Sequence, residues 1–128
     1  MHGAIRPRLT RRAGLRCTSW RFRRWVEQAC EDLPATYRHV LQNVAVVVED
    51  SPPDDVQADG GALGYYQGTP IGERGTNYHL ALPDKISIYR RPLLATCRTQ
   101  SELRAEIRLT VFHEVGHYFG LDDDEIPF

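Results

Sequence analysis

The chain has few cysteines and no long apolar run, and these absences exclude several classes of protein. None of its 128 residues lies in a stretch approaching the roughly 18 uncharged apolar residues that a membrane-spanning helix needs. The start also has no apolar segment of the length that a secretory signal requires. The three cysteines are an odd number without CxxC spacing, which argues against a disulfide framework and a cysteine-rich zinc site. We therefore expect a cytoplasmic protein with free thiols and no membrane partner.

Acidic residues are absent from the first 24 positions, which hold eight arginines. Hydrophobic periodicity is also missing at the start, so we predict a basic, flexible tail over residues 1–18 and one domain over residues 19–128. An arginine-rich arm can contact phosphates. No aromatic interleaving and no nucleic-acid-binding motif accompanies it, so association with nucleic acid is the least favoured of the functions considered below.

An amphipathic helix is predicted at the start of the domain. Apolar residues recur at steps of three and four between Trp20 and Leu33, which lines one helix face. Thr18 or Ser19 can cap this helix, and Pro34 interrupts it. A further helical turn or two is expected over residues 35–42.

Short β-branched or alternating segments predict a small sheet. Residues 44–48 read as a buried strand, and residues 85–90 as a half-buried strand closed by Pro92. Residues 51–83 between them hold six glycines and four prolines, with one strand near residues 62–66. With a helix on either side of these strands, the order predicts an α+β domain with a mixed sheet.

The last predicted helix carries the motif with chemical content. Thr99 and Glu102 form a capping-box pattern, and Gly120 supplies the residue that ends the helix. Inside it, His113 and His117 are four residues apart, so their imidazoles project from one face and can aim at one metal ion. Glu114 beside the first histidine can reach a water molecule next to that ion.

The apolar positions of this helix support a metal site over a pair of core histidines. At 100° per residue they cluster opposite the two histidines, whereas histidines satisfied inside a core should lie within the apolar stripe. These positions are Leu103, Ile107, Val111, Val115 and Tyr118.

A catalytic zinc site needs a third protein ligand. Gly120 allows the chain to reverse toward the ion, and four acidic residues follow it. By charge alone any of the four could serve, and histidines elsewhere are alternatives. These candidates are Asp122, Asp123, Asp124, Glu125, His79 and, less favoured, His39, with His2 discounted as part of the tail. Two imidazoles and a carboxylate also suit iron(II), but the spacing with an adjacent glutamate favours zinc.

The full spacing, His113-Glu114-x-x-His117-x-x-Gly120-x-x-Asp123, resembles a zincin motif with aspartate as the third ligand. A metzincin would need a methionine after that ligand, and the only methionine is Met1. The chain is more similar to a bacterial family of minimal zincin-like metallopeptidases, formerly a domain of unknown function. The resemblance runs from about Phe22 to Asp124 and is carried by residues 43–50, 63–68, 82–93 and 113–123.

This resemblance implies a compact zincin-like fold, with the sheet packed against an N-terminal helix and the motif-bearing C-terminal helix. It also implies zinc held by His113, His117 and Asp123, with Glu114 as the catalytic residue. Family members usually continue beyond the acidic segment, so we expect the loop that carries Asp123 to be less supported here.

We therefore expect a zinc-dependent hydrolase of peptides or proteins, with Glu114 as general base. The segment 51–83 and the strand 85–90 would form the cleft wall, with substrate along a strand edge. Candidates to stabilise the oxyanion are Tyr78, His79 and Tyr89. The alternative is a metal-binding module without catalysis that contacts a partner, in which a fourth protein ligand such as His79 closes the site. The oligomeric state and the natural substrate are not indicated.

Overall fold

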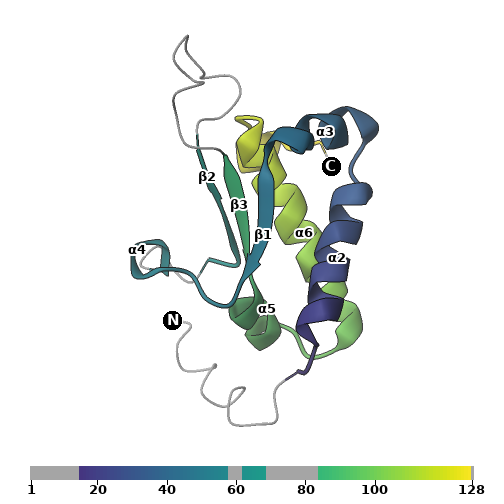
Figure 1. Cartoon of the computed structure of the whole chain (residues 1–128), viewed down its shortest axis with the longest axis vertical. Coiled ribbons are helices and arrows are strands. Elements are labelled where there is room, and N and C mark those ends of the chain that lie inside the picture. The colour runs from purple at the N-terminus through teal and green to yellow at the C-terminus, as the bar shows by residue number, and fades with distance from the viewer. Residues whose placement is uncertain (1–14, 58–61, 69–83, 128) are drawn as a thin grey trace.

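The computed structural model describes residues 15–57, 62–68 and 84–127 (Figure 1). Its elements confirm the predicted α+β class. In chain order they are α2 (Ser19–Glu31), α3 (Ala35–Val40), the 3-10 turn η1 (Leu41–Asn43), β1 (Ala45–Glu49), α4 (Asp54–Gln57), β2 (Gly64–Gln67), β3 (Lys85–Tyr89), α5 (Arg90–Thr96), α6 (Gln100–Tyr118) and the 3-10 turn η4 (Asp123–Glu125).

The sheet is mixed, with strand order β1-β3-β2. Strand β1 is parallel to β3, and β2 is antiparallel to β3. Two burial predictions were wrong. The strand expected to be buried is β1, which lies at an edge and is only partly covered. The strand expected to be half-buried is β3, which is central, with four of its five residues buried. A central strand has partners on both edges, which a local pattern does not reveal.

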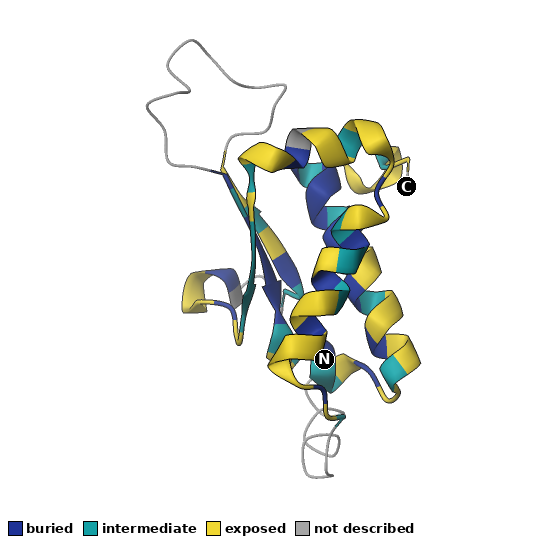
Figure 2. Cartoon of the chain, turned by 45° about the vertical axis from the view of Figure 1, so that its right-hand side comes forward, coloured by how far each residue is buried: buried dark blue, intermediate teal, exposed yellow. Residues whose placement is uncertain are grey.

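Helix α6 lies between the sheet and α2, as Figures 1 and 2 show. Register places Ile86, Val46 and Tyr66 side by side on one face of the sheet, and Ile88 lies on the same face two residues along β3. Tyr66 contacts Tyr118 of α6 edge to face, with ring centroids 5.7 Å apart, so this face is the one that packs on the helix. The short helix α4 lies on the opposite side of the sheet.

The apolar stripe predicted for α6 forms the centre of the core. All five of its residues are 0–1% exposed. They pack with α2 on one side and the sheet on the other, together with Phe22, Val26, Leu33, Ile86, Ile88 and Leu93. His113 and His117 lie outside this stripe, and both are partly exposed.

The two long helices begin as their sequences predict. The Thr18 hydroxyl accepts a hydrogen bond from the Arg21 N–H at 3.1 Å. The Thr99 hydroxyl accepts one from the Glu102 N–H at 3.0 Å. The Glu102 carboxylate, however, accepts from the backbone N–H of Arg98 rather than from that of Thr99. The second hydrogen bond of the predicted capping box is thus made by the N–H of the residue before Thr99.

Helices α4 and α5 were not predicted. Pro92 was expected to close the strand before it, but it lies in the first turn of α5. Proline is tolerated there because the N–H groups of the first turn have no partner inside the helix. The strand-to-helix change at Tyr89 and Arg90 takes place without an intervening turn signal, so the local pattern contains no sign of it.

The start of the domain includes residues that precede α2. Cys17 is 6% exposed and belongs to the core, and its carbonyl accepts a hydrogen bond from the Arg90 guanidinium at 3.1 Å. The side-chain amide of Gln100 donates to the carbonyl of Arg16. Of the predicted tail over residues 1–18, residues 1–14 lie outside the described residues, and there the tail stays a prediction.

The cysteines are free thiols held in their neutral form. Burial raises the pKa of both Cys30 and Cys97 to about 11 and also raises that of Cys17. A protonated thiol is a poor metal ligand and a poor nucleophile. Within the described parts of the chain, no helix has the length and low polarity needed to cross a membrane.

Candidate metal centre

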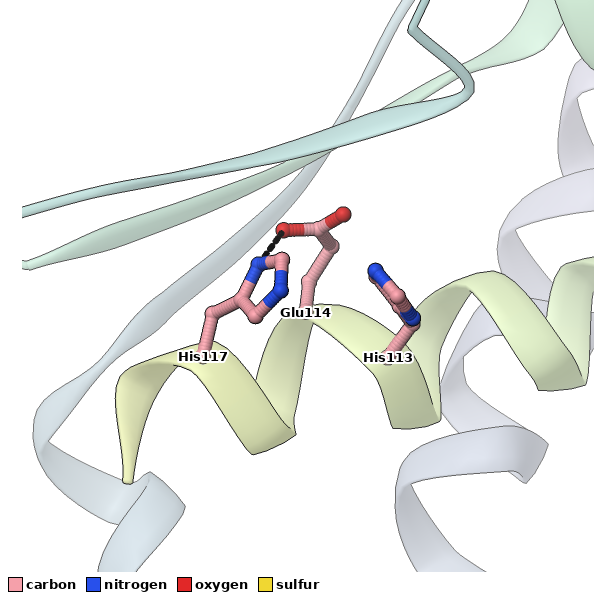
Figure 3. A group of neighbouring side chains, drawn as sticks. All are labelled: His113, Glu114 and His117. Atoms are coloured by element: carbon pink, nitrogen blue, oxygen red, sulfur yellow. Dashed lines mark hydrogen bonds and ion pairs between the residues drawn. The ribbon is translucent and has the colours of Figure 1, made fainter. Parts of the chain in front are cut away.

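Helix α6 brings together the two histidines and the glutamate of the motif. The rings of His113 and His117 have centroids 4.5 Å apart, with planes inclined at 69°. Both imidazoles are partly exposed, whereas the Glu114 side chain is only 8% exposed. One ligand atom from each of these three residues lies within 4.8 Å of the other two. Figure 3 shows all three side chains rising from the same side of the helix.

Asp123 joins this group from the turn that follows the helix. Its Oδ1 atom lies 3.2 Å from Nε2 of His113 and 3.2 Å from Nε2 of His117. The side chain is 74% exposed, so it reaches the imidazoles from the solvent side. The predicted ligand therefore lies where the two Nε2 atoms converge.

The other third-ligand candidates are not brought to the imidazoles. Within the described chain, Asp122 and Asp124 make no contact with them, and the Glu125 carboxylate accepts the backbone N–H of Asp122 at 2.8 Å. His39 lies on α3, and no contact joins it to the motif within the described residues. His2 and His79 lie outside the described residues.

The chain reverses after α6 through the predicted glycine. Gly120 has a φ of 79°, a left-handed conformation that a residue with a Cβ rarely adopts. Its N–H donates to the His117 carbonyl at 2.9 Å, and the Leu121 N–H donates to the Gly116 carbonyl at 3.0 Å. These two bonds form a Schellman motif. The reversal directs the acidic turn back along the helix toward the imidazoles.

Glu114 is held between α6 and β2. Its carboxylate accepts a hydrogen bond from the backbone N–H of Tyr66, and Nδ1 of His117 lies 3.3 Å from its Oε1 (Figure 3). Burial raises the pKa of Glu114 above its ordinary value, although the two imidazoles and these hydrogen bonds act in the opposite direction. The carboxylate is thus partly desolvated and held in one orientation.

A glycine in β2 makes this close approach possible. A Cβ at Gly64 would lie 2.8 Å from Cγ2 of Thr110 and 3.2 Å from Cγ of Glu114. It would also lie 3.1 Å from the backbone oxygen of Ser87. Any larger residue would push β2 away from α6 at the point where Tyr66 contacts Glu114.

The outer edge of β2 lies beside Glu114. The Leu63 carbonyl accepts the Tyr89 N–H at 2.9 Å, which makes that pair a hydrogen-bonded one. In an antiparallel ladder such pairs alternate, so Tyr65 and Gln67 face β3 while Gly64 and Tyr66 turn their backbone groups outward. Strand β3 is central, so among the described strands β2, which lies within the segment 51–83 predicted for the cleft wall, offers the free edge next to the motif.

Of the three predicted oxyanion candidates, the described residues include only Tyr89, and its position does not support that role. Tyr89 is 1% exposed and pairs across the sheet with Glu49, on the face away from α6. Its hydroxyl is bonded to Ser87 of that same face, and burial raises its pKa. Tyr78 and His79 lie outside the described residues. The hydrogen bond from the Tyr66 backbone to Glu114 was not predicted, because a main-chain donor has no residue signature.

Comparison with known proteins agrees with this geometry. Residues 41–127 match the family described as zincin-like metallopeptidase. The chain belongs to the zincin-like metallopeptidase family. A conserved hypothetical protein from Thermo thermophilus is similar in structure, with a TM-score of 0.55 and 27% sequence identity over 80% of this chain and 94% of that one. No curated protein matches the chain at a significant level.

The donor set fits the metal that a zincin-like metallopeptidase implies, which is usually zinc. Two ligands about 2.1 Å from one tetrahedral ion are roughly 3.4 Å apart. The two separations of 3.2 Å between Asp123 Oδ1 and the imidazole Nε2 atoms are close to that value. Two neutral imidazoles and one carboxylate are also the ligand types of catalytic zinc sites.

Two carboxylates compete for the third position. A ligand atom of Glu114 lies within 4.8 Å of both imidazoles, but its Oε1 faces Nδ1 of His117, whereas Asp123 faces Nε2 of that ring. Asp123 instead faces Nε2 of both rings. The geometry therefore separates the two acids, with Asp123 on the side where the rings converge and Glu114 on the side of β2.

Proposed function

We propose that this zincin-like protein is a zinc-dependent peptidase that hydrolyses peptide bonds in peptides or proteins. The observation that supports it best is the convergence of Asp123 Oδ1 on Nε2 of both His113 and His117, with the buried Glu114 carboxylate adjacent. This is an arrangement of three ligands and one nearby base, as catalytic zinc sites require.

In this proposal His113, His117 and Asp123 hold the metal. Donation from Nδ1 of His117 to Glu114 would leave Nε2 with its lone pair, which is the form that binds a metal. The same hydrogen bond fixes the orientation of the ring. Glu114 thus contributes to the site before any chemistry takes place.

A bound zinc ion would supply a Lewis acid that makes water more acidic and polarises a carbonyl group. In the proposed reaction, Glu114 accepts a proton from the attacking water molecule while the oxygen of that water bonds to the carbonyl carbon. It then delivers that proton to the amine nitrogen as the C–N bond breaks, leaving a carboxylic acid and a free amine. Burial supports this role, because a raised pKa brings the carboxylate closer to the proton affinity that transfer in both directions needs.

We place the substrate along the outer edge of β2. Gly64 turns its N–H and carbonyl, and Tyr66 its carbonyl, toward this edge, and a peptide in an extended conformation can pair with such groups. The Tyr66 N–H is already bonded to Glu114. The edge therefore leads a peptide to the carboxylate that would act on it.

The rival proposal is a closed metal site without catalysis. Glu114 is near enough to the imidazoles to serve as a fourth ligand, which would leave no position for water. Its bonds to Tyr66 and to Nδ1 of His117 favour the base over the ligand. The two roles predict different zinc contents for Glu114→Gln: a general base can be replaced without loss of zinc, whereas replacing a ligand weakens zinc binding.

The experiment compares wild type with Glu114→Gln on a mixture of unstructured peptides, with product detection by mass spectrometry. We expect zinc content to be retained and cleavage to fall by roughly 10²–10⁴-fold, the usual contribution of a general base. Glu106→Gln, on the same helix two turns earlier, is the control and should keep full activity. Loss of zinc in Glu114→Gln, or cleavage at the wild-type rate, would contradict the assigned role.

A further inference from the structure

We propose that Ile126 is a positioning residue that holds Asp123 against the imidazoles by packing on Gly116. The proposal rests on the proposed role of Asp123 as a metal ligand. Neither Ile126 nor Gly116 touches the reacting groups. The loop that carries Asp123 was expected to be less supported than in family members. The structure instead gives this turn two anchors on a single residue of α6.

The first anchor is a hydrogen bond. The Leu121 N–H donates to the Gly116 carbonyl at 3.0 Å and brings the chain back over the last turn of α6. Leu121 precedes Asp123 in the sequence, so this hydrogen bond fixes the position at which the acidic turn begins.

The second anchor is a side-chain contact after Asp123. A Cβ built on Gly116 would lie 2.5 Å from Cδ1 and 2.6 Å from Cγ1 of Ile126. Ile126 thus occupies the space that a side chain at position 116 would fill. Because glycine leaves that space open, the segment after the turn can lie directly on the helix.

Between the anchors, η4 keeps the turn compact. The Asp122 N–H donates to the Glu125 carboxylate at 2.8 Å, and the Glu125 N–H donates to the Asp122 carbonyl at 2.8 Å. Asp123 lies inside this small loop, whose two ends both contact Gly116. Its backbone position is therefore set from both sides.

This positioning matters because Asp123 has no other support. Its side chain is 74% exposed, and its contacts in the described chain are the two imidazoles. An exposed carboxylate on a loose loop would lose conformational freedom on binding a metal, and a fixed loop avoids most of that loss. We therefore expect the packing of Ile126 on Gly116 to increase the affinity for zinc.

The test measures zinc affinity by competition with a chelator for wild type, Ile126→Ala, Ile126→Val and Gly116→Ala. We expect Ile126→Ala to weaken zinc binding by about 10–100-fold, the range typical of residues that support a metal ligand. Ile126→Val, which keeps most of the contact, should bind nearly as wild type. Pro127→Ala, the exposed next residue, is the control and should show no change.

Gly116→Ala separates positioning from general stability. Alanine favours a helix over glycine, so the metal-free protein should unfold at the same temperature as wild type or higher. Its methyl group nevertheless displaces Ile126, so zinc affinity should fall. Because both changes break one contact, Gly116→Ala combined with Ile126→Ala should cost little more than the larger single effect.

Two results would overturn the inference in distinguishable ways. Wild-type zinc affinity in Ile126→Ala and in Gly116→Ala, with Asp123→Ala impaired, would remove the positioning role and leave the proposed function intact. Failure of wild type to bind zinc, or wild-type affinity in Asp123→Ala, would overturn the proposed function and this inference together.

Discussion

Two carboxylates reach the same pair of imidazoles from different parts of the molecule, and their surroundings differ sharply. Glu114 lies on α6 beneath β2, with 8% of its side chain exposed and a backbone hydrogen bond from Tyr66. Asp123 lies on the turn beyond the helix, with 74% of its side chain exposed. The first is fixed by the core of the domain and the second by a short loop.

The difference teaches how one chemical group can be given two roles. Burial makes the charged form of Glu114 less favourable, which would suit the general base proposed above. The exposed Asp123 side chain can approach a cation from the solvent side, but it requires the loop to hold it in place. Changes at the two acids should therefore affect different measurements.

The largest expected effect is on metal binding at the turn. Asp123→Ala removes one of three proposed ligands, and zinc affinity should fall by at least about 100-fold, the upper range for loss of a merely supporting residue. Asp124→Ala, an equally exposed neighbour in the same turn, should bind zinc as wild type does. Competition with a chelator measures both. Equal affinities in the two variants would show that Asp123 is not a ligand.

A smaller effect is expected where the helix meets β2. Gly64→Ala places a methyl group against the Ser87 backbone oxygen and the Thr110 side chain, so unfolding should become easier by about 1–3 kcal/mol. Gln67→Ala, exposed on the same strand, should change stability by less than about 0.5 kcal/mol. Chemical denaturation checks both values. An unchanged Gly64→Ala protein would mean that β2 does not press on Glu114.

The smallest effect concerns the charges themselves in metal-free protein. Because the pKa of Glu114 is raised in the folded protein, folding favours the protonated form of this side chain. Its contribution to the free energy of unfolding is therefore present below its ordinary pKa and is lost as the pH rises. The stability of Glu114→Gln relative to wild type should therefore increase as the pH rises from about 4 to about 7. A Glu114→Gln protein that is less stable at neutral than at acidic pH, relative to wild type, would contradict this assignment.

Much of the fold could be predicted because its signals are local. The Thr18 and Thr99 caps, the left-handed Gly120 and the apolar stripe of α6 follow from nearest neighbours along the chain. The convergence of the two imidazoles likewise follows from helical geometry. Strand burial and helix α5 were missed, because they depend on which segments meet in space.

The supports of the site were the least visible in the sequence. The Tyr66 backbone donor has no residue signature, and Gly64 and Gly116 resemble any other glycine until their neighbours are known. Ile126 is a single apolar residue in a polar segment, a pattern too short to carry a periodicity. The grouping of the two histidines and Glu114 could be predicted from the sequence, whereas the contacts that hold these side chains in place required the structure.

The account depends most on the claim that the imidazoles of His113 and His117 share one metal ion. Its direct test is the zinc content of protein loaded with zinc and then dialysed, for wild type, His117→Ala and His39→Ala. We predict one zinc per chain in wild type and in His39→Ala, and none in His117→Ala. Wild type without zinc, or His117→Ala with a full equivalent, would contradict it.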